Sequence, residues 1–237
     1  MKIEVWSDFV CPFCYIGKRN LEIALEAFPN KESVAIEYMS YQLDPTATHI
    51  PGKDFYETFS ELKGVPLPEV KTMNEEVREQ AKTVGLDYRF DTMKYSNTFD
   101  AHRVAQYAAK KGKGQEITEH FLHAYFTESE LLSDYDTLVK LSSEVGLDMT
   151  EVKEVLQSDQ YKRKVNADID TARQIGVQGV PFFVFNEKYA VSGAQPSEVF
   201  TQVLAKVWEE EVEKAHHQSS NPKKAETSYC TGEDCEI

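Results

Sequence analysis

The sequence predicts an α/β fold in which two strand-containing units are separated by a long helical segment. Strand, helix and strand patterns follow one another within the first 43 residues, which indicates a βαβ unit with a right-handed crossover. From about residue 46 to residue 165, every periodic segment has helical spacing. A further helix, two short strands and a last helix follow, so the second unit has the order α-ββα.

The first unit begins with a predicted strand at residues 2–7, where Ile3 and Val5 alternate with polar neighbours. A helix with apolar residues at helical spacing comes next, and Pro29 ends it. Residues 33–43 are rich in β-branched and aromatic side chains and form the second predicted strand.

The remaining elements are expected from apolar periodicity and from glycines that suit helix C-termini. Helices are predicted at residues 53–63, 68–84, 97–111, 115–126, 135–145, 150–156 and 161–175. Strands are predicted at residues 180–185 and 188–191, joined by a turn, and Ser197 caps a last helix that ends near residue 214.

Without the helical segment, the two units form a thioredoxin-like core (βαβ…ββα). We therefore expect a discontinuous core domain at residues 1–45 and 166–214, with a large all-helical insertion at residues 46–165. Residues 215–237 are polar and lack periodicity, so we expect them to form a flexible C-terminal tail.

The composition limits the classes of partner. The 237 residues carry a formal net charge of −14, with a pI near 4.9. Nucleic acids and anionic membranes both bind basic surfaces, so neither is an expected partner. The chain start has no apolar signal segment, and no stretch approaches the ~18 apolar residues of a membrane span. We expect a cytoplasmic protein, in a compartment that keeps thiols reduced.

Four cysteines occur, and they form two close pairs, Cys11 with Cys14 and Cys230 with Cys235. A structural disulfide framework would spread its cysteines across the fold, so this arrangement points to reactive chemistry or to a metal. Histidines and glutamates at residues 116–123 also have spacing that would suit a metal. They fit an exposed helix face better, and we expect no metal there.

The first pair, in Cys11-Pro12-Phe13-Cys14, lies between a predicted strand and a predicted helix. Unpaired N–H groups and the helix dipole favour negative charge at a helix N-terminus, so Cys11 is expected to be a nucleophile with a lowered pKa. Cys14, one turn into the helix, is the expected resolving thiol. Half of a zinc site and a pair of inert core cysteines are the alternatives, and redox function is favoured.

Pro181 is the second functional candidate. Gly179-Val180-Pro181 stands directly before an apolar strand. A cis Val180–Pro181 bond would bring the start of this strand close to Cys11 and would offer the Val180 backbone to an extended substrate. A trans proline that merely begins the strand is the alternative, and the cysteine pair makes the cis form the favoured one.

Three motifs resemble the FrnE-like group of DsbA-family oxidoreductases, which is related to 2-hydroxychromene-2-carboxylate isomerases and kappa-class glutathione transferases. They are SDFVCPFCYIG at residues 7–17, NT with AHR at residues 97–103, and GVQGVPFFV at residues 176–184. The resemblance covers about residues 1–214. It implies Cys11 as the nucleophile, Cys14 as the resolving thiol and Pro181 as a cis proline, and it suggests a role in oxidative stress. The related isomerases and transferases usually have serine at the position of Cys11.

One departure concerns the proton acceptor. Thioredoxins and DsbA place a buried acid six residues before the first cysteine, and this chain has Val5 there. Asp8 is a nearby substitute, although an exposed loop position or a capping role is the favoured interpretation.

Other candidates for a pocket near the cysteines are Phe13, Asn97 and His102. By resemblance to the isomerases, Asn97 and His102 would face Cys11. The favoured interpretations are a helix N-cap for Asn97 and a surface or packed side chain for His102.

The second pair lies in Cys230-Thr231-Gly232-Glu233-Asp234-Cys235, where turn-forming residues would let the two sulfurs meet. A closed loop this short adds little stability, which argues against a structural role. A tethered dithiol can instead exchange with the first pair as a redox relay. Incidental thiols and a four-thiolate zinc site shared with Cys11 and Cys14 are the alternatives. A C-terminal pair of this spacing is also a feature of some FrnE-like proteins.

Together these features predict a cytosolic thiol–disulfide oxidoreductase without a bound cofactor. Its expected partners are protein or small-molecule thiols and disulfides, with glutathione as a candidate co-substrate. The alternatives are a glutathione-dependent isomerase or transferase that acts between core and insertion, and an adaptor that binds peptides along Val180 without catalysis.

Overall fold

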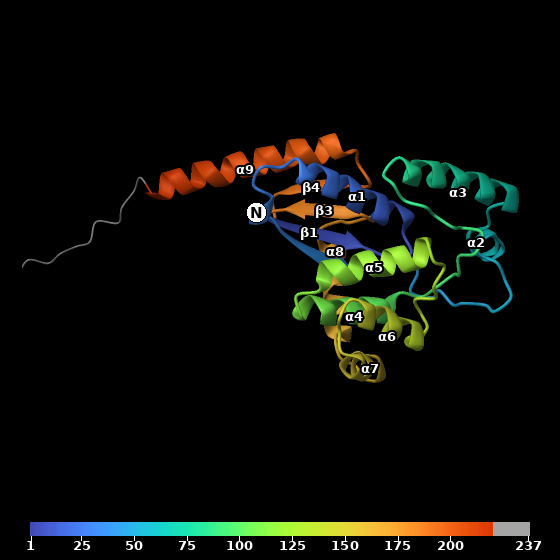
Figure 1. Cartoon of the computed structure of the whole chain (residues 1–237). Helices are drawn as coiled ribbons and strands as arrows, with labels where there is room; N and C mark the ends of the chain where they lie inside the picture. The colour runs from blue at the N-terminus through green and yellow to red at the C-terminus, as the bar shows by residue number, and fades with distance from the viewer. Residues whose placement is uncertain (220–237) are drawn as a thin grey trace, which may run out of the picture.

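The computed structural model describes residues 1–219 and contains a four-stranded sheet (Figure 1). The strands are β1 (Lys2–Ser7), β2 (Ala35–Ser40), β3 (Phe182–Phe185) and β4 (Tyr189–Ser192), in the order β2-β1-β3-β4. β1 and β2 are parallel, whereas β3 is antiparallel to both β1 and β4. The thioredoxin-like α/β fold predicted from the sequence is confirmed.

Helices cover both faces of the sheet. α1 (Pro12–Glu26) and α9 (Ser197–Ser219) pack against each other on one face. Successive strand residues point to opposite faces, so Ile3 and Val5 join the α1–α9 core. On the other face, Trp6 packs with residues of α8 (Lys162–Gln174), and its indole N–H donates to the Asp168 carbonyl oxygen (2.9 Å).

The insertion consists of helices, as predicted. They are α2 (Phe55–Lys63), α3 (Leu67–Lys82), α4 (Phe99–Lys110), α5 (Gly114–Phe126), α6 (Tyr135–Glu144) and α7 (Met149–Gln157). Their buried side chains form one cluster with Tyr15 and Ile16 of α1, so the insertion packs directly on the start of α1. The α2–α3 pair stands apart from α4–α7 and lies beside the start of α1 (Figure 1).

Several boundaries differ from the sequence predictions. The second strand is shorter than residues 33–43, because a 3-10 turn (Lys31–Ser33) precedes it. The third strand begins at Phe182 rather than at residue 180. The last helix continues past residue 214 to Ser219, so the start predicted for the tail at residue 215 is wrong. Residues 208–215 explain this, because they include several good helix formers. Within residues 1–219, no helix is both long and apolar enough to cross a membrane.

Candidate active site

The first cysteine pair lies where β1 passes into α1. Cys11 is the N-cap residue in an extended conformation (φ −90°, ψ 111°), and Pro12 is the first helical residue. The Cys11 N–H donates to the Asp8 carbonyl oxygen (3.1 Å), and the Cys14 N–H donates to the Cys11 carbonyl oxygen (3.0 Å). Cys11 therefore sits among the unpaired N–H groups of a helix start, as the sequence predicted.

Pro181 lies beside this pair. The Val180–Pro181 bond is cis, as predicted. The thiol of Cys11 donates to the Val180 carbonyl oxygen at 3.4 Å. The Pro181 carbonyl oxygen accepts a hydrogen bond from the Gly193 N–H (2.8 Å), which ties this loop to the end of β4. Residues that are 169 positions apart in the chain thus form one wall around the Cys11 sulfur.

Gly17 allows α1 to approach Pro181 closely. A Cβ atom at position 17 would lie 2.9 Å from Pro181 Cγ and 3.2 Å from Phe183 Cζ. Contacts this short force a neighbour to move, so the position requires glycine. Gly17 lies in the first of the three motifs, and a glycine inside a predicted helix is a signal of close packing.

The two thiols differ in environment. Burial, followed by the contact with Cys11 and its charge, raises the pKa of the Cys14 thiol well above its usual range. The Ser7 hydroxyl and the Asp8 N–H face the Cys14 sulfur and lower its pKa by less than burial raises it. Cys14 is therefore a neutral thiol at neutral pH, which is the state that suits a resolving cysteine before it is activated.

Asp8 is fully buried, so the exposed loop position favoured from the sequence is wrong. Its Oδ2 accepts the Leu43 N–H (2.7 Å), and its Oδ1 lies 3.3 Å from His102 Nε2. Helices α4 and α5 cover the loop, because Phe9 packs on the His102 ring (4.7 Å between centroids) and edge-on against Phe121. His102 is a packed side chain, which is one of the two favoured interpretations.

Asn97 has a structural position. Thr98 is the N-cap residue of α4, while Asn97 Oδ1 accepts the Phe99 N–H (2.9 Å). The Asn97 amide also donates to the Pro45 carbonyl oxygen (3.0 Å) and holds the loop after β2. Neither Asn97 nor His102 is among the residues that line the groove at Cys11.

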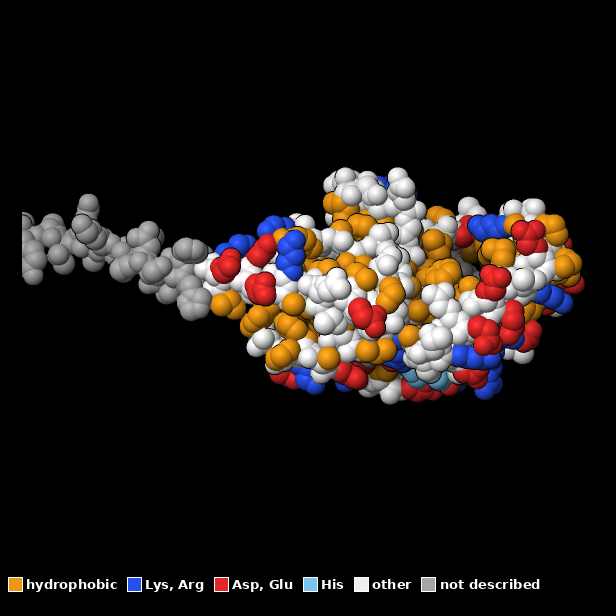
Figure 2. All heavy atoms as spheres, turned by 90° about the horizontal axis from the view of Figure 1, so that it is seen from above, with side chains coloured by type: hydrophobic (Ala, Val, Ile, Leu, Met, Phe, Trp, Pro, Cys, Tyr) orange, Lys and Arg blue, Asp and Glu red, His pale blue; other side chains and the backbone are white. Residues whose placement is uncertain are grey.

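An apolar groove of about 420 Å³ opens at the Cys11 side of the pair. We use the name apolar groove for the space between α1, the Val180 loop and the α2–α3 pair. Hydrophobic side chains gather where the body of the molecule meets this helix pair (Figure 2). The lining of the apolar groove is mostly hydrophobic and includes Val10, Cys11, Phe13, Phe55, Phe59, Met73, Val77, Phe90, Met93 and Val180. Its polar members include Asp44 and Lys63.

Phe13 lines the apolar groove and is 40% exposed, so its predicted pocket position is consistent with the structure. The contributions of α2 and α3 were not identified from the sequence. The apolar side chains of α3 do not all face the core, because Val70 is fully buried whereas Met73 is 47% exposed.

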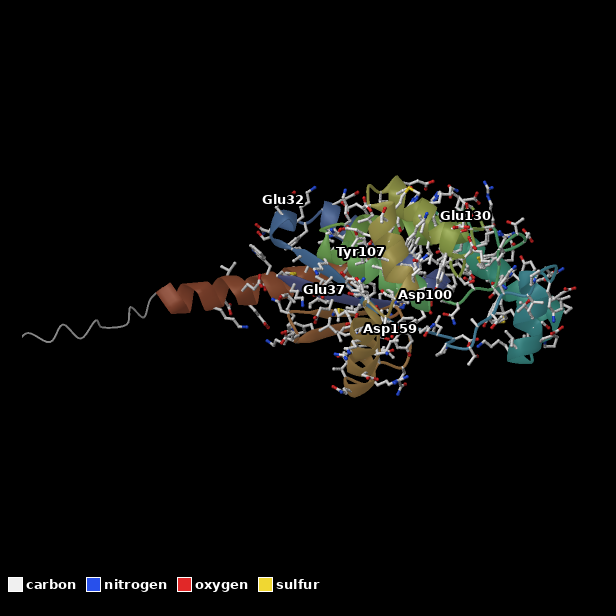
Figure 3. The ribbon with its side chains drawn as sticks, turned by 90° about the horizontal axis from the view of Figure 1, so that it is seen from below. Glu32, Glu37, Asp100, Tyr107, Glu130 and Asp159 are labelled. Carbon is white, nitrogen blue, oxygen red and sulfur yellow. The ribbon has the colours of Figure 1, made fainter. Side chains whose placement is uncertain are left out.

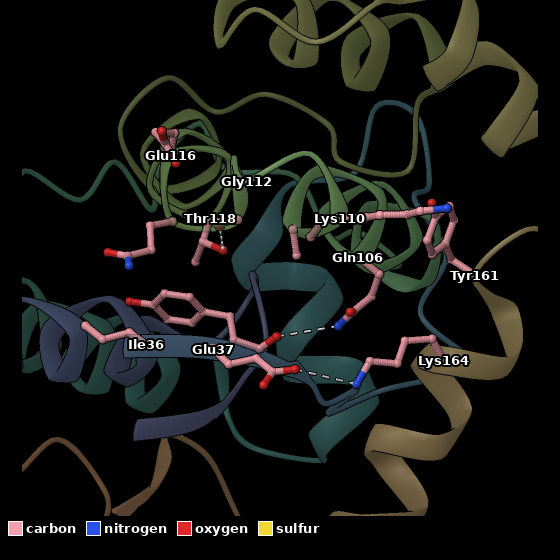
Figure 4. Close-up of a pocket in the computed structure, with 14 residues that line it drawn as sticks. Ile36, Glu37, Gln106, Lys110, Gly112, Glu116, Thr118, Tyr161 and Lys164 are labelled. Atoms are coloured by element: carbon pink, nitrogen blue, oxygen red, sulfur yellow. Dashed lines mark hydrogen bonds and ion pairs between the residues drawn. The ribbon is translucent and has the colours of Figure 1, made fainter. Parts of the chain in front are cut away.

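A larger, polar hollow of about 880 Å³ lies away from both cysteines, between β2, α4, α5 and α8 (Figure 4). Glu37 on its wall lies 3.8 Å from Lys164, and Gln106 donates to Ser40 Oγ (3.0 Å) and to Asp168 (2.8 Å). These bonds tie α4 and α8 to the edge strand. The acidic side chains labelled on this side, such as Glu37, Asp100 and Asp159, come from different elements (Figure 3).

Among the side chains of residues 1–214, no group of three or more His, Cys, Asp or Glu could hold a metal ion. His120 pairs with Glu144 (2.6 Å), and His123 lies 3.6 Å from Glu128. The second pair, Cys230 and Cys235, lies outside the described residues.

A thiol pair at the first turn of α1, faced by a cis proline on a mixed four-stranded sheet, defines the thioredoxin-like class of redox domains. Residues 2–205 match the model of a protein family described as "DSBA-like thioredoxin domain". The chain therefore belongs to the DsbA-like thioredoxin domain family.

Solved structures agree with this assignment. A probable DsbA oxidoreductase, SCO1869 from Streptomyces coelicolor, is 34% identical with a TM-score of 0.83, over 100% of this chain and 99% of that chain. Two further structures share the fold at low identity. A 2-hydroxychromene-2-carboxylate isomerase is 13% identical (TM-score 0.65, 90% and 98% covered). The cytosolic disulfide reductase DsbM from Pseudomonas aeruginosa with GSH is 12% identical (TM-score 0.63, 87% and 99% covered).

Proposed function

We propose that the protein is a cytosolic thiol–disulfide oxidoreductase that acts on extended polypeptide segments, with Cys11 as nucleophile and Cys14 as resolving thiol. One observation carries the proposal: the Cys11 sulfur lies at a helix N-terminus, 3.4 Å from the Val180 oxygen, at the wall of the apolar groove. The description of DsbM as a cytosolic disulfide reductase, solved with GSH, supports the compartment and glutathione as co-substrate.

The reaction proceeds in two exchange steps. The Cys11 thiolate attacks a substrate disulfide, a mixed disulfide forms, and the leaving thiolate takes a proton. Cys14 then attacks the Cys11 sulfur, which releases the second substrate thiol and leaves a Cys11–Cys14 disulfide. Two electrons pass to the substrate, and an external dithiol or two molecules of glutathione restore the pair. The reverse sequence oxidises a substrate dithiol.

The groove supports a polypeptide substrate. Phe55, Phe59 and Phe90 offer an apolar surface within the same space as Cys11. An extended segment can place an apolar side chain on these rings while its backbone meets Val180. The contact of Asp44 with Tyr95 (2.7 Å) fixes the polar rim.

We further propose that the C-terminal pair exchanges with the first pair, and the length of α9 is compatible with such an exchange. The helix starts near Gly17 and Pro181, where Ala194 lies, and its 23 residues span about 34 Å away from them (Figure 1). Cys230 follows Ser219 by 11 residues, which extend at most about 38 Å, whereas the 16 residues to Cys235 extend about 55 Å. Both lengths exceed the span of the helix, so either thiol can reach Cys11 within one chain.

Insulin reduction by the full chain tests the main proposal. We expect activity in the wild type and in a Cys230→Ser/Cys235→Ser variant supplied with glutathione, and none in Cys11→Ser. Activity that survives Cys11→Ser would contradict the assigned nucleophile. Turnover of a small-molecule substrate in that same variant would support the isomerase or transferase alternative instead.

Limited oxidation followed by digestion without reduction tests the relay. Peptides that join Cys11 to Cys230 or to Cys235 are expected in dilute solution. The absence of both peptides, or stoichiometric zinc, would contradict the relay.

A further inference from the structure

The Ser7 hydroxyl is a buried polar group at the end of β1. Ser7 is 5% exposed, and its Oγ has no hydrogen-bond partner within residues 1–214, a property shared there with Ser142 Oγ. It lies near the sulfur of Cys14 and lowers the pKa of that thiol. A buried hydroxyl without a hydrogen-bond partner is costly, so its position near a reacting sulfur points to a role in the reaction.

A cavity of about 10 Å³ connects Ser7 with His102. This is near the volume that one water molecule needs, and its lining offers polar groups, including the side chains of Gln106 and Thr118. His102 Nε2 lies 3.3 Å from Asp8 Oδ1, so a carboxylate there accepts the Nε2–H and leaves Nδ1 as the basic nitrogen.

We propose that Ser7, His102 and Asp8 form a proton path that receives the proton of Cys14 when Cys14 attacks the mixed disulfide. This inference rests on the proposed function. The Cys14 thiol proton passes to Ser7 Oγ, and the Ser7 hydroxyl proton passes through one water in the cavity to His102 Nδ1. Asp8 keeps the imidazolium oriented and compensates its charge. The Cys14 thiolate forms the bond to Cys11 as the bond to the substrate sulfur breaks, and the departing thiolate takes a proton from solvent.

A base is required because burial keeps Cys14 protonated at neutral pH. The position of the thioredoxin acid cannot supply one, since Val5 is buried in the apolar core. Four tyrosines lie near Cys14 or Asp8, and none of them is the base. Burial raises the pKa of each phenol, so each stays neutral. They are Tyr38 of β2, Tyr88 and Tyr95 of the loop between α3 and α4, and Tyr125 of α5. The remaining titratable groups at this place are Cys11, Asp8 and His102.

The two steps can be timed separately with Ellman's reagent. In the Cys230→Ser/Cys235→Ser full chain, attack by Cys11 releases one thionitrobenzoate, and resolution by Cys14 releases the second. We expect Ser7→Ala and His102→Gln to slow the second release about 100-fold near neutral pH, which is the lower range for a positioned base. The first release should stay within about twofold, since Cys11 keeps its helix start.

Matched controls and a pH profile separate this path from a structural role. Ser142→Ala removes the other buried hydroxyl without a partner, and His120→Gln removes another histidine–carboxylate pair; both should leave the two releases unchanged. In the path variants, the second rate should rise about tenfold per pH unit through neutrality, while the wild-type rate levels off.

If Ser7→Ala gives a normal first release, and its second release has the wild-type rate and pH profile, the proton path is contradicted while the proposed function stands. If the wild type gives no first release, the proposed function fails, and the path fails with it. Ser7→Ala removes a single oxygen atom, so it still tests the path if His102→Gln does not fold.

Discussion

Both cysteines are buried, yet the two sides of the pair differ in polarity and in access to solvent. Cys11 faces the apolar groove, which is open and lined by aromatic and aliphatic side chains. Cys14 faces the Ser7 hydroxyl and the Asp8 N–H. The Asp8 carboxylate in turn pairs with His102, and α4 and α5 cover this region. This difference fits the two proposals, in which the apolar groove binds the substrate and the buried side accepts the proton of Cys14.

The largest expected effect is a difference in alkylation rate between the two thiols. Burial, followed by the contact with Cys11, raises the pKa of Cys14, so its thiolate fraction near pH 7 is small and grows as the pH rises. We expect iodoacetamide to label Cys14 in Cys11→Ala about 100-fold more slowly than Cys11 in Cys14→Ala, measured by mass spectrometry at pH 7. Equal rates, or a Cys14 rate that is flat with pH, would remove the contrast.

A groove substitution should affect polypeptide substrates only. Burial of an aromatic ring contributes about 1.5–3 kcal/mol, so Phe59→Ala should raise the KM for insulin about tenfold. Its reaction with Ellman's reagent should not change. Ile175→Ala, which truncates an exposed hydrophobic side chain outside the groove, is the control. An unchanged KM in Phe59→Ala would exclude this wall as the binding surface.

The close packing of α1 on Pro181 depends on Gly17. In Gly17→Ala the new Cβ would meet Pro181 and Phe183, and overpacking of this kind destabilises by about 1–3 kcal/mol. Urea unfolding measures the loss. Gly179→Ala, where a Cβ meets no atom within 4 Å, should change stability little. Comparable stability of the two variants would argue against close packing of α1 on the proline.

A smaller effect is expected at Glu119, which links α5 to Lys18 and to Tyr15 (2.6 Å) of α1. Burial alone would raise its pKa, but the Lys18 charge and the hydrogen bonds lower it below the usual value. A carboxyl of this kind stabilises the fold above its unfolded pKa, and that stability is lost as pH falls through its folded pKa.

Glu119→Gln should therefore cost about 1–2 kcal/mol of unfolding free energy at pH 7, and the difference should fade below about pH 4. Glu61→Gln, at an exposed pair with Lys53, serves as the control. A difference that persists unchanged in acid would mean that the charge of Glu119 is not its source.

The sequence predicted those features of the site that depend on a few neighbouring residues. Cys11, Cys14 and the cis Val180–Pro181 bond follow from short motifs, because a helix start and a strand start each impose their geometry within a few residues. Asp8 and His102 were assigned separately, since 94 residues separate them and only the packing of α4 over the loop brings them together.

The groove was missed for a related reason. An apolar stripe has the same period whether it faces a core or a binding surface, so Met73 and Val77 could not be assigned from spacing. The end of α9 was predicted too early because the polar residues after Lys214 were interpreted as the start of the tail.

Capture of a covalent intermediate tests the central claim most directly. In a Cys14→Ser/Cys230→Ser/Cys235→Ser chain, Cys11 has no resolving partner, so its mixed disulfide with a substrate should persist. After incubation with a disulfide-bonded polypeptide and acid quenching, mass spectrometry of the digest should locate one adduct, at Cys11. The absence of an adduct, with Cys11 free and the protein folded, would contradict the assignment of Cys11 as the nucleophile.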